Sequence, residues 1–202
     1  MKTTKFDSNE QWMAARLGKI TGSRLKDIVV KRGTGKKIGY YELIAERLGV
    51  PADDEKPMDR GHRLENEAME RFSKETGQKV DMSLIMWTRD DNESIAISPD
   101  GVIGKTEAVE VKCLSSARHM EAYLTCEVPD EYQMQGIQYF ICNDKLKKLH
   151  FVFYDPRFLV EKVVYFTIEI TRDQVAKEIE EYLAYERNVI MEIDRIVNQL
   201  TF

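Results

Sequence analysis

The sequence predicts a fold of mixed α and β class, with a central mixed β-sheet flanked by helices and one long helix at the C-terminus. Three observations support this prediction. Apolar residues recur at helical spacing in several segments, runs rich in β-branched and aromatic residues lie between them, and the C-terminal segment is a long amphipathic repeat. A chain of 202 residues, 43% hydrophobic and 32% charged, is typical of one globular domain, here expected over 1–202.

The first expected elements are short helices in the N-terminal part of the chain. One is expected over 8–16, where Ser8 is a suitable N-cap, and another over 22–30. A third is expected over 38–48, because its apolar residues are spaced three and four apart.

The fourth expected helix, over 61–77, has the clearest pattern of the N-terminal half. Leu64, Ala68 and Phe72 form an apolar stripe at every fourth position. Gly77 follows the last periodic residues and is a suitable C-cap, because glycine readily adopts the left-handed conformation that ends many helices. This segment is therefore expected to pack one face against the core.

Strands are expected in the middle and late parts of the chain, since β-branched and aromatic residues are concentrated there. A helix between them is expected over 130–142, with Met134, Ile137 and Ile141 facing the core. The expected strands cover 79–87, 94–98, 107–113, 148–155 and 161–170.

The last expected element is a helix over about 172–200. It opens with Thr171-Arg172-Asp173-Gln174, which is a capping-box pattern, and apolar residues then recur at helical spacing.

Charge and cysteine content restrict the class of protein. The net charge of −5 argues mildly against a nucleic-acid partner, although it says nothing about how the charges are arranged. The three cysteines are odd in number and lack CxxC spacing, which suits buried free thiols in a reducing cytosol. The chain has no apolar run long enough for a membrane span and no apolar core of a secretory signal, so a cytoplasmic protein without a membrane partner is expected.

The stretch AISPDGVIGKTEAVEVKC, residues 96–113, carries the chemistry of greatest interest. Side chains alternate along a strand, so Glu110 and Lys112 are expected on the same face. Charged groups on a central strand are costly to bury unless they are paired or functional. A hairpin that folds 94–98 back on 107–113 would bring Asp100 beside Glu110.

Two adjacent carboxylates suit a hard divalent cation, and a nearby ammonium group can orient a water molecule. This combination is what metal-assisted phosphodiester hydrolysis requires. Two other interpretations remain open from this stretch alone. Asp100 is also a good turn-forming residue in SPDG, and Glu110 and Lys112 could form an ion pair on a solvated face of the sheet.

Further motifs surround this stretch in a fixed order. They are RLGKITGS (residues 16–23) and RGHRLENEAMERF (60–72) before it, and EYQMQGIQYFI (131–141) and YDPR (154–157) after it. Taken in order, these pieces resemble the lambda exonuclease (viral alkaline exonuclease) family of the PD-(D/E)xK nuclease superfamily. The resemblance covers about residues 10–170 and implies a restriction-endonuclease-like core.

The resemblance implies roles for the residues around the metal. Asp100 and Glu110 would be its carboxylate ligands, with the carbonyl group of Val111 as a third ligand. Lys112 would be the catalytic lysine. Glu65 would act at the metal directly or through water.

The helix over 130–142 carries two glutamines of the QxQ type. By resemblance, Gln133 would help to place the attacking water. Gln135 has two interpretations of equal standing, a functional one and hydrogen bonding at the edge of the core.

Recognition of the DNA end is implied for Arg16 and Ser23, which match the residues of the family that bind a terminal 5′-phosphate. A guanidinium is a forked, permanently charged donor to phosphate. Trp12 is suited either to stacking on a base or to core packing. Arg118 is a candidate for contact with the DNA backbone.

The resemblance implies a Mg²⁺-dependent 5′→3′ exonuclease that uses two ions per site and also accepts Mn²⁺. It would digest one strand of linear double-stranded DNA with a 5′-phosphorylated end to mononucleotides, and leave a 3′ single strand for recombination by single-strand annealing. The resemblance also implies a ring-shaped homotrimer and a single-strand annealing protein as partner. The expected location is the cytoplasm of a bacterial or phage-infected cell. The alternatives are an endonuclease on the same fold, of restriction or junction-resolving type, and a non-catalytic DNA-binding protein.

Overall fold

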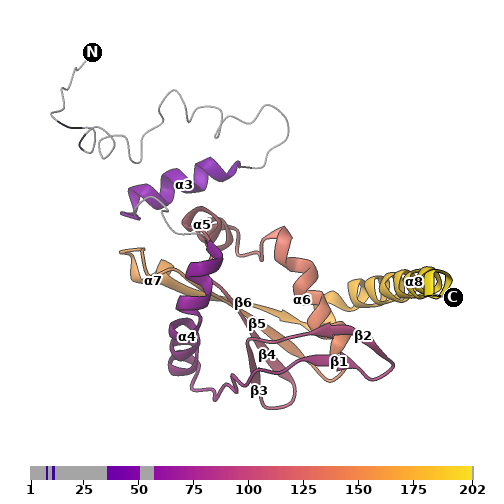
Figure 1. The fold of residues 1–202 in the computed structure, drawn as a ribbon. Helices are drawn as coiled ribbons and strands as arrows, with labels where there is room; N and C mark the ends of the chain where they lie inside the picture. The colour runs from indigo at the N-terminus through magenta and orange to yellow at the C-terminus, as the bar shows by residue number, and fades with distance from the viewer. Residues whose placement is uncertain (1–7, 9–10, 12–35, 51–56, 202) are drawn as a thin grey trace. The chain divides into compact units, whose positions relative to one another are not determined.

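The computed structural model in Figure 1 describes residues 8, 11, 36–50 and 57–201. The helix expected over 22–30 lies outside these residues, and so does the helix expected over 8–16 except for Ser8 and Gln11. The hydroxyl group of Ser8 accepts a hydrogen bond from the backbone amide of Gln11 at 3.2 Å, which is the contact expected of an N-cap.

The chain divides into two compact units, which are described separately below. The first comprises Met1–Glu65, Lys112–Glu127 and Phe153–Phe166, and the second comprises Asn66–Val111, Val128–Val152 and Thr167–Phe202. The expected single domain stays a prediction.

The fold contains a four-stranded mixed sheet in the order β3-β4-β5-β6. Its strands are β3 (Gly101–Ile103), β4 (Glu107–Lys112), β5 (Lys148–Tyr154) and β6 (Tyr165–Thr171). β3 and β4 are antiparallel, with Gly101 opposite Val109 and Ile103 opposite Glu107. The turn between them contains Gly104 at φ 59°, a left-handed conformation that favours glycine. These strands confirm the mixed α and β class predicted from the sequence.

A separate two-stranded antiparallel sheet consists of β1 (Trp87–Arg89) and β2 (Asn92–Ile97). The hairpin expected between 94–98 and 107–113 is therefore wrong. A short turn at Asp90 and Asp91 pairs β2 with β1, and the three-residue strand after Asp100 is the one that pairs with β4.

The strand expected over 79–87 is also wrong for most of its length. Before β1, this segment makes only an isolated bridge between Asp81 and Val102. The carboxylate of Asp81 then accepts hydrogen bonds from the amide of Ser83 at 3.0 Å and from its hydroxyl at 2.6 Å. Such a local turn competes with strand pairing, and Leu84 just after it is fully exposed.

The first unit contains α3 (Ile38–Arg47), α5 (Ser116–Thr125) and the short α7 (Glu161–Val164). α3 confirms the helix expected over 38–48. α5 was not predicted, although Ser115 caps it by accepting from the amide of Arg118 at 3.4 Å. Buried apolar residues of these helices form one core cluster, which includes Tyr41, Ala45, Ala117, Met120 and Val163.

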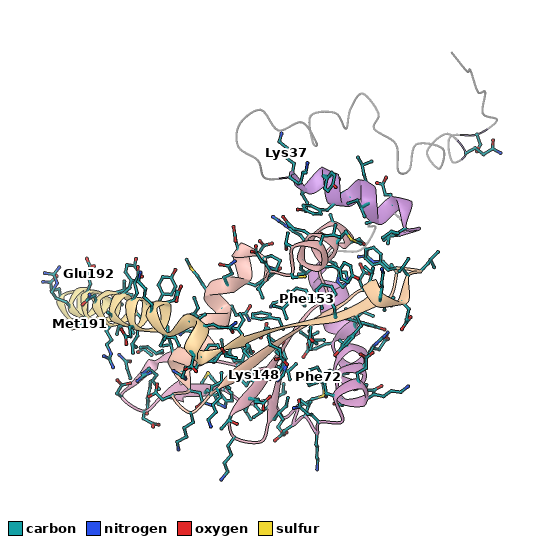
Figure 2. The ribbon with its side chains drawn as sticks, turned by 180° about the vertical axis from the view of Figure 1, so that it is seen from behind. Lys37, Phe72, Lys148, Phe153, Met191 and Glu192 are labelled. Atoms are coloured by element: carbon teal, nitrogen blue, oxygen red, sulfur yellow. The ribbon has the colours of Figure 1, made fainter. Side chains whose placement is uncertain are left out.

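The second unit contains most of α4 (Pro57–Thr76), together with α6 (Asp130–Cys142) and α8 (Ala176–Thr201). The expected stripe of α4 is buried, and its last member is Phe72 (Figure 2). The ring of Phe72 packs edge-on against His150 of β5 at 5.2 Å between centroids. Gly77 ends the helix at φ 69°, as expected of a C-cap.

α6 matches the helix expected over 130–142 residue for residue. Ile137 and Ile141 are buried as expected, but Met134 is 66% exposed, so its predicted core position is wrong. Gly136 lets this helix approach β5 closely, since a Cβ atom at that position would lie 3.0 Å from the ring of Phe151.

The C-terminal helix begins with the predicted capping box, in which the amide of Thr171 donates to the side-chain carbonyl of Gln174 at 2.7 Å. The η1 turn (Arg172–Val175) leads into α8, which contacts α6. Met191 and Glu192 lie toward the end of α8 (Figure 2), and the side chain of Met191 is 62% exposed.

Arg172 connects this segment to the end of α6. Its guanidinium group donates to the carbonyl of Phe140 at 2.8 Å, to that of Asn143 at 2.6 Å and to that of Leu146 at 2.7 Å. The last carbonyls of a helix lack partners within the helix, so this arginine satisfies acceptors at the C-terminus of α6. Within the described part of the chain, no helix is long and apolar enough to cross a membrane.

Candidate active site

The candidate site in the second unit begins with Asp100, which directly precedes β3. Because Gly101 lies opposite Val109, antiparallel pairing brings Asp100 to the neighbourhood of Glu110 and Val111. The backbone amide of Val111 donates a hydrogen bond to the Asp100 carboxylate at 2.8 Å. Asp100 is therefore tied to the strand that carries Glu110, although the strand pairing differs from the predicted one.

Glu110 is the central acidic group of this site and is only 3% exposed. The side-chain amide of Gln135 donates to its Oε1 atom at 2.7 Å, and the hydroxyl of Tyr139 donates to its Oε2 atom. Gln135 and Tyr139 are four residues apart on α6, so they lie on the same face of the helix. Each carboxylate oxygen of Glu110 thus has its own donor from α6.

Tyr139 is the titratable donor in this pair of contacts. Burial raises the pKa of Tyr139 far above its ordinary value, and the negative charge of Glu110 raises it further. Tyr139 therefore keeps its proton and acts as the donor to Glu110.

Gln133 lies on a different side of α6. Its side-chain amide donates to the carbonyl of Val128 and to the carboxylate of Asp130, at 3.1 Å in each case, and the residue is exposed. Two residues of a helix that are two positions apart point about 200° from each other. The glutamine that reaches Glu110 is therefore Gln135.

Val111, Lys112 and Glu65 were also predicted for the site. Val111 is buried in β4 directly after Glu110, and Lys112 ends the strand with a half-buried side chain. Glu65 is a half-buried residue of α4. Glu65 and Lys112 belong to the first unit, and their convergence with Asp100 and Glu110 stays a prediction.

Of the predicted DNA-binding residues, the structure describes Arg118. Trp12, Arg16 and Ser23 lie outside the residues that the structure describes. Arg118 lies in α5, where its guanidinium is 2.5 Å from the carboxylate of Glu121 and its side chain is 42% exposed. Its contact with the DNA backbone stays a prediction.

The YDPR motif forms a buried ion pair in the first unit. Asp155 is 1% exposed, and its carboxylate accepts from the guanidinium of Arg157 at 2.7 Å and from the hydroxyl of Ser116 at 3.0 Å. Burial lowers the pKa of Arg157 from its ordinary value. These contacts tie the segment after β5 to the start of α5, which is a structural role.

Asp100 and Glu110 offer carboxylate oxygens, which are the ligands that a hard divalent cation prefers. Among the described residues, no group of three or more His, Cys, Asp or Glu side chains is arranged to hold a metal ion. Mg²⁺ commonly uses one or two carboxylates and takes its other ligands from water and substrate. The hydrogen bonds from Val111 and Gln135 orient the carboxylates of Asp100 and Glu110, which are ligands of the type that this cation prefers.

Comparisons with known proteins agree with the ordered motifs. A family model described as the YqaJ-like viral recombinase domain matches residues 11–145, which is more than half of the chain. None of the curated proteins compared with the sequence matches it.

Two solved structures of one relative match almost the whole chain. The alkaline exonuclease LHK-Exo of Laribacter hongkongensis is 32% identical, and the match covers 96% of this chain and 98% of that chain with a TM-score of 0.62. LHK-Exo in complex with dAMP matches with the same identity and coverage and a TM-score of 0.61. The chain thus shares its fold with an alkaline exonuclease, and it belongs to the YqaJ-like viral recombinase family.

Proposed function

We propose that this protein is a Mg²⁺-dependent 5′→3′ exonuclease that digests one strand of linear double-stranded DNA to mononucleotides. The chain is a nuclease of the viral recombinase family, and its 32% identical relative is an alkaline exonuclease. The observation that carries the proposal is the buried carboxylate of Glu110, which is held by two donors and stands near Asp100.

In this proposal Asp100, Glu110 and the carbonyl group of Val111 hold the metal, and Glu65 assists directly or through water. Two ions per site are expected, and Mn²⁺ is expected to replace Mg²⁺. The bound cations supply Lewis-acid stabilisation of charge on the phosphate and on the leaving oxygen. The hydrogen bonds from Val111 and Gln135 keep the two carboxylates oriented before any cation arrives.

The remaining polar residues act on the water and on the carboxylates. Lys112 orients the attacking water and favours its deprotonated form through its positive charge. Gln133 is proposed to help place the same water, as the resemblance implies. Gln135 is added to the site because its amide fixes the Oε1 atom of Glu110.

Selection of the DNA end is assigned to the N-terminal segment. Arg16 and Ser23 would bind the terminal 5′-phosphate, Trp12 would stack on a base, and Arg118 would contact the DNA backbone. A pocket for a terminal phosphate explains why an enzyme of this kind acts from an end and not from within the duplex.

The 3′ single strand that remains would serve recombination by single-strand annealing, with an annealing protein as partner. A ring-shaped homotrimer around the DNA is proposed for processive digestion. The free cysteines, Cys113, Cys126 and Cys142, are compatible with a reducing compartment such as the cytosol of a bacterial or phage-infected cell.

Digestion of matched DNA substrates tests the proposed function. The purified protein is incubated with a 5′-phosphorylated linear duplex and with the same sequence as a closed circle, each with Mg²⁺ and with a chelator. The expected result is release of mononucleotides from the linear duplex with Mg²⁺ only, and an intact circle. The control variant Glu110→Gln keeps the side-chain shape, removes the charge, and should leave both substrates intact.

Two outcomes would overturn the proposal. Cleavage of the circle would identify an endonuclease of restriction or junction-resolving type. Binding of linear duplex without any Mg²⁺-dependent release of nucleotides would identify a non-catalytic DNA-binding protein.

A further inference from the structure

Tyr139 contacts the central acidic residue of the site through its hydroxyl group. This hydroxyl donates to the Oε2 atom of Glu110. The tyrosine is fully buried, and its ring packs edge-on against Trp87 at 6.1 Å between centroids. The residue therefore combines a core position with a polar contact at the carboxylate of Glu110.

Packing alone does not account for the hydroxyl group. A phenylalanine ring would fill the same space against Trp87, and a buried hydroxyl is unfavourable unless it is hydrogen-bonded. In this fold the hydroxyl donates to Glu110, which is one of the residues proposed to hold the metal. The hydroxyl group of Tyr139 therefore serves the carboxylate of Glu110, while its ring packs in the core.

The geometry of Glu110 explains what such a donor does. The last torsion of a glutamate side chain is broad and nearly two-fold, so an unsupported carboxylate rotates easily. Gln135 holds one oxygen at 2.7 Å, and Tyr139 holds the other. Each of these bonds restrains the plane of the carboxylate, and loss of the tyrosine hydroxyl removes the restraint that it places on the Oε2 atom.

We propose that Tyr139 is a positioning residue that fixes the carboxylate of Glu110 for binding of the divalent cation. This inference rests on the proposed function, because it takes Glu110 as a metal ligand. Partners of metal ligands commonly contribute about 10- to 100-fold to metal affinity or activity. The same range is expected for loss of the tyrosine hydroxyl.

The test measures Mg²⁺ binding to the DNA-free enzyme by titration calorimetry, alongside thermal unfolding. Tyr139→Phe removes one oxygen atom and is expected to fold, and to bind Mg²⁺ about 10- to 100-fold more weakly. Tyr185→Phe is the matched control, because Tyr185 lies on α8 and is 68% exposed. It makes the same chemical change and should bind Mg²⁺ as the unmodified enzyme does.

Activity gives a second readout that a purely structural role would not move. Cleavage by Tyr139→Phe should recover when Mg²⁺ is raised about 10- to 100-fold, because the defect is in cation binding. Unchanged Mg²⁺ affinity in a folded Tyr139→Phe variant would overturn the inference, even if the variant were less stable. Failure of the proposed function looks different, since the unmodified enzyme would then fail to degrade linear duplex.

A measurement on the unmodified side chain covers the case in which the variant does not fold. Tyrosines labelled with ¹³C at the carbon that bears the hydroxyl are followed by NMR during addition of Mg²⁺. One buried signal, altered in Glu110→Gln, is expected to shift with the same Mg²⁺ dependence as the calorimetric binding. The inference would be refuted if no buried tyrosine signal shifted either on addition of Mg²⁺ or in the Glu110→Gln variant.

Discussion

The backbone amide of Val111 donates to the carboxylate of Asp100 at 2.8 Å, and this bond fixes the acidic group that precedes β3 against the strand that carries Glu110. The bond joins residues eleven positions apart. Asp100 therefore has two properties that substitution can remove separately, namely its negative charge and its ability to accept this hydrogen bond. Two substitutions at this position can therefore be compared.

Asp100→Asn is expected to keep the fold and lose cleavage. Asparagine retains an acceptor for the amide of Val111 but has no negative charge for a cation, so cleavage should fall by more than about 100-fold. Asp100→Ala also leaves the amide of Val111 without this acceptor, and it should lower the free energy of unfolding by about 1–3 kcal/mol more than Asp100→Asn does. Denaturant unfolding and rates on linear duplex check both effects. Nuclease activity of Asp100→Asn close to that of the unmodified enzyme would remove Asp100 from the metal site.

Gln135 and Gln133 are expected to affect different quantities. Gln135→Met removes the donor to Glu110 and should weaken Mg²⁺ binding by about 10- to 100-fold. Gln133→Met should lower the turnover rate and leave Mg²⁺ affinity unchanged, because its amide contacts Val128 and Asp130. Calorimetry with Mg²⁺ and single-turnover cleavage distinguish the two variants. If Gln133→Met were the variant with weaker Mg²⁺ binding, the assignment of the two glutamines would have to be exchanged.

Lys112→Ala is expected to abolish cleavage while binding of DNA survives. A positioned acid-base group typically contributes about 10²- to 10⁴-fold to rate, and the lysine is proposed to act on the water. The measurements are single-turnover cleavage with Mg²⁺ and fluorescence anisotropy of labelled duplex with Ca²⁺. Equal losses in cleavage and in binding would show that the lysine mainly holds the DNA.

Arg16→Ala is expected to remove the preference for 5′-phosphorylated ends. The unmodified enzyme should digest a phosphorylated end faster than a hydroxyl end, because a guanidinium is a strong donor to phosphate. The variant should digest both ends at the same rate. Paired time courses on the two substrates provide the measurement, and a preference retained by the variant would contradict the phosphate pocket.

Arg172→Lys is expected to lower stability, because an ammonium group cannot reproduce the forked contacts with the carbonyls of Phe140, Asn143 and Leu146. The expected loss is about 2 kcal/mol in the free energy of unfolding. Arg187→Lys is the control. Arg187 pairs with Asp91 at the surface, and its replacement should cost less than about 0.5 kcal/mol. Similar unfolding curves for the two variants would contradict the role of Arg172.

The elements with strong local signals were predictable from the sequence. Helix α6 was predicted at its observed bounds, and the capping box at Thr171 marks the observed start of the C-terminal helical segment. In both cases the signal is local, since helical periodicity and caps depend on residues a few positions apart. α5 was missed, although Ser115 caps it and its buried residues Ala117 and Met120 lie at helical spacing.

Strand pairing was less predictable because it depends on distant residues. β3 has only three residues, so no alternating pattern distinguishes it, and the hairpin was assigned to β2 in its place. The proximity of Asp100 and Glu110 was nevertheless predicted, because both pairings place the segment that contains Asp100 beside β4.

The donors to Glu110 show where the sequence analysis of the site fell short. Gln135 had two interpretations of equal standing and Tyr139 was not a candidate, although their spacing by one helical turn indicates a shared face. That spacing predicts which residues lie together, but it does not predict which group they meet. The contact with Glu110 depends on how α6 packs on β4, which no local pattern specifies.

The three hydrogen bonds from Arg172 to backbone carbonyls give the C-terminal segment that starts at this residue, here called the tail, a structural role. Segments beyond the recognised motifs are common choices for removal when a minimal enzyme is designed, and this tail carries none of those motifs. Its first arginine nevertheless holds the end of the helix that supports Glu110. A shortened protein that stops before Arg172 would retain every proposed catalytic group and still lose the scaffold that keeps one of them in place.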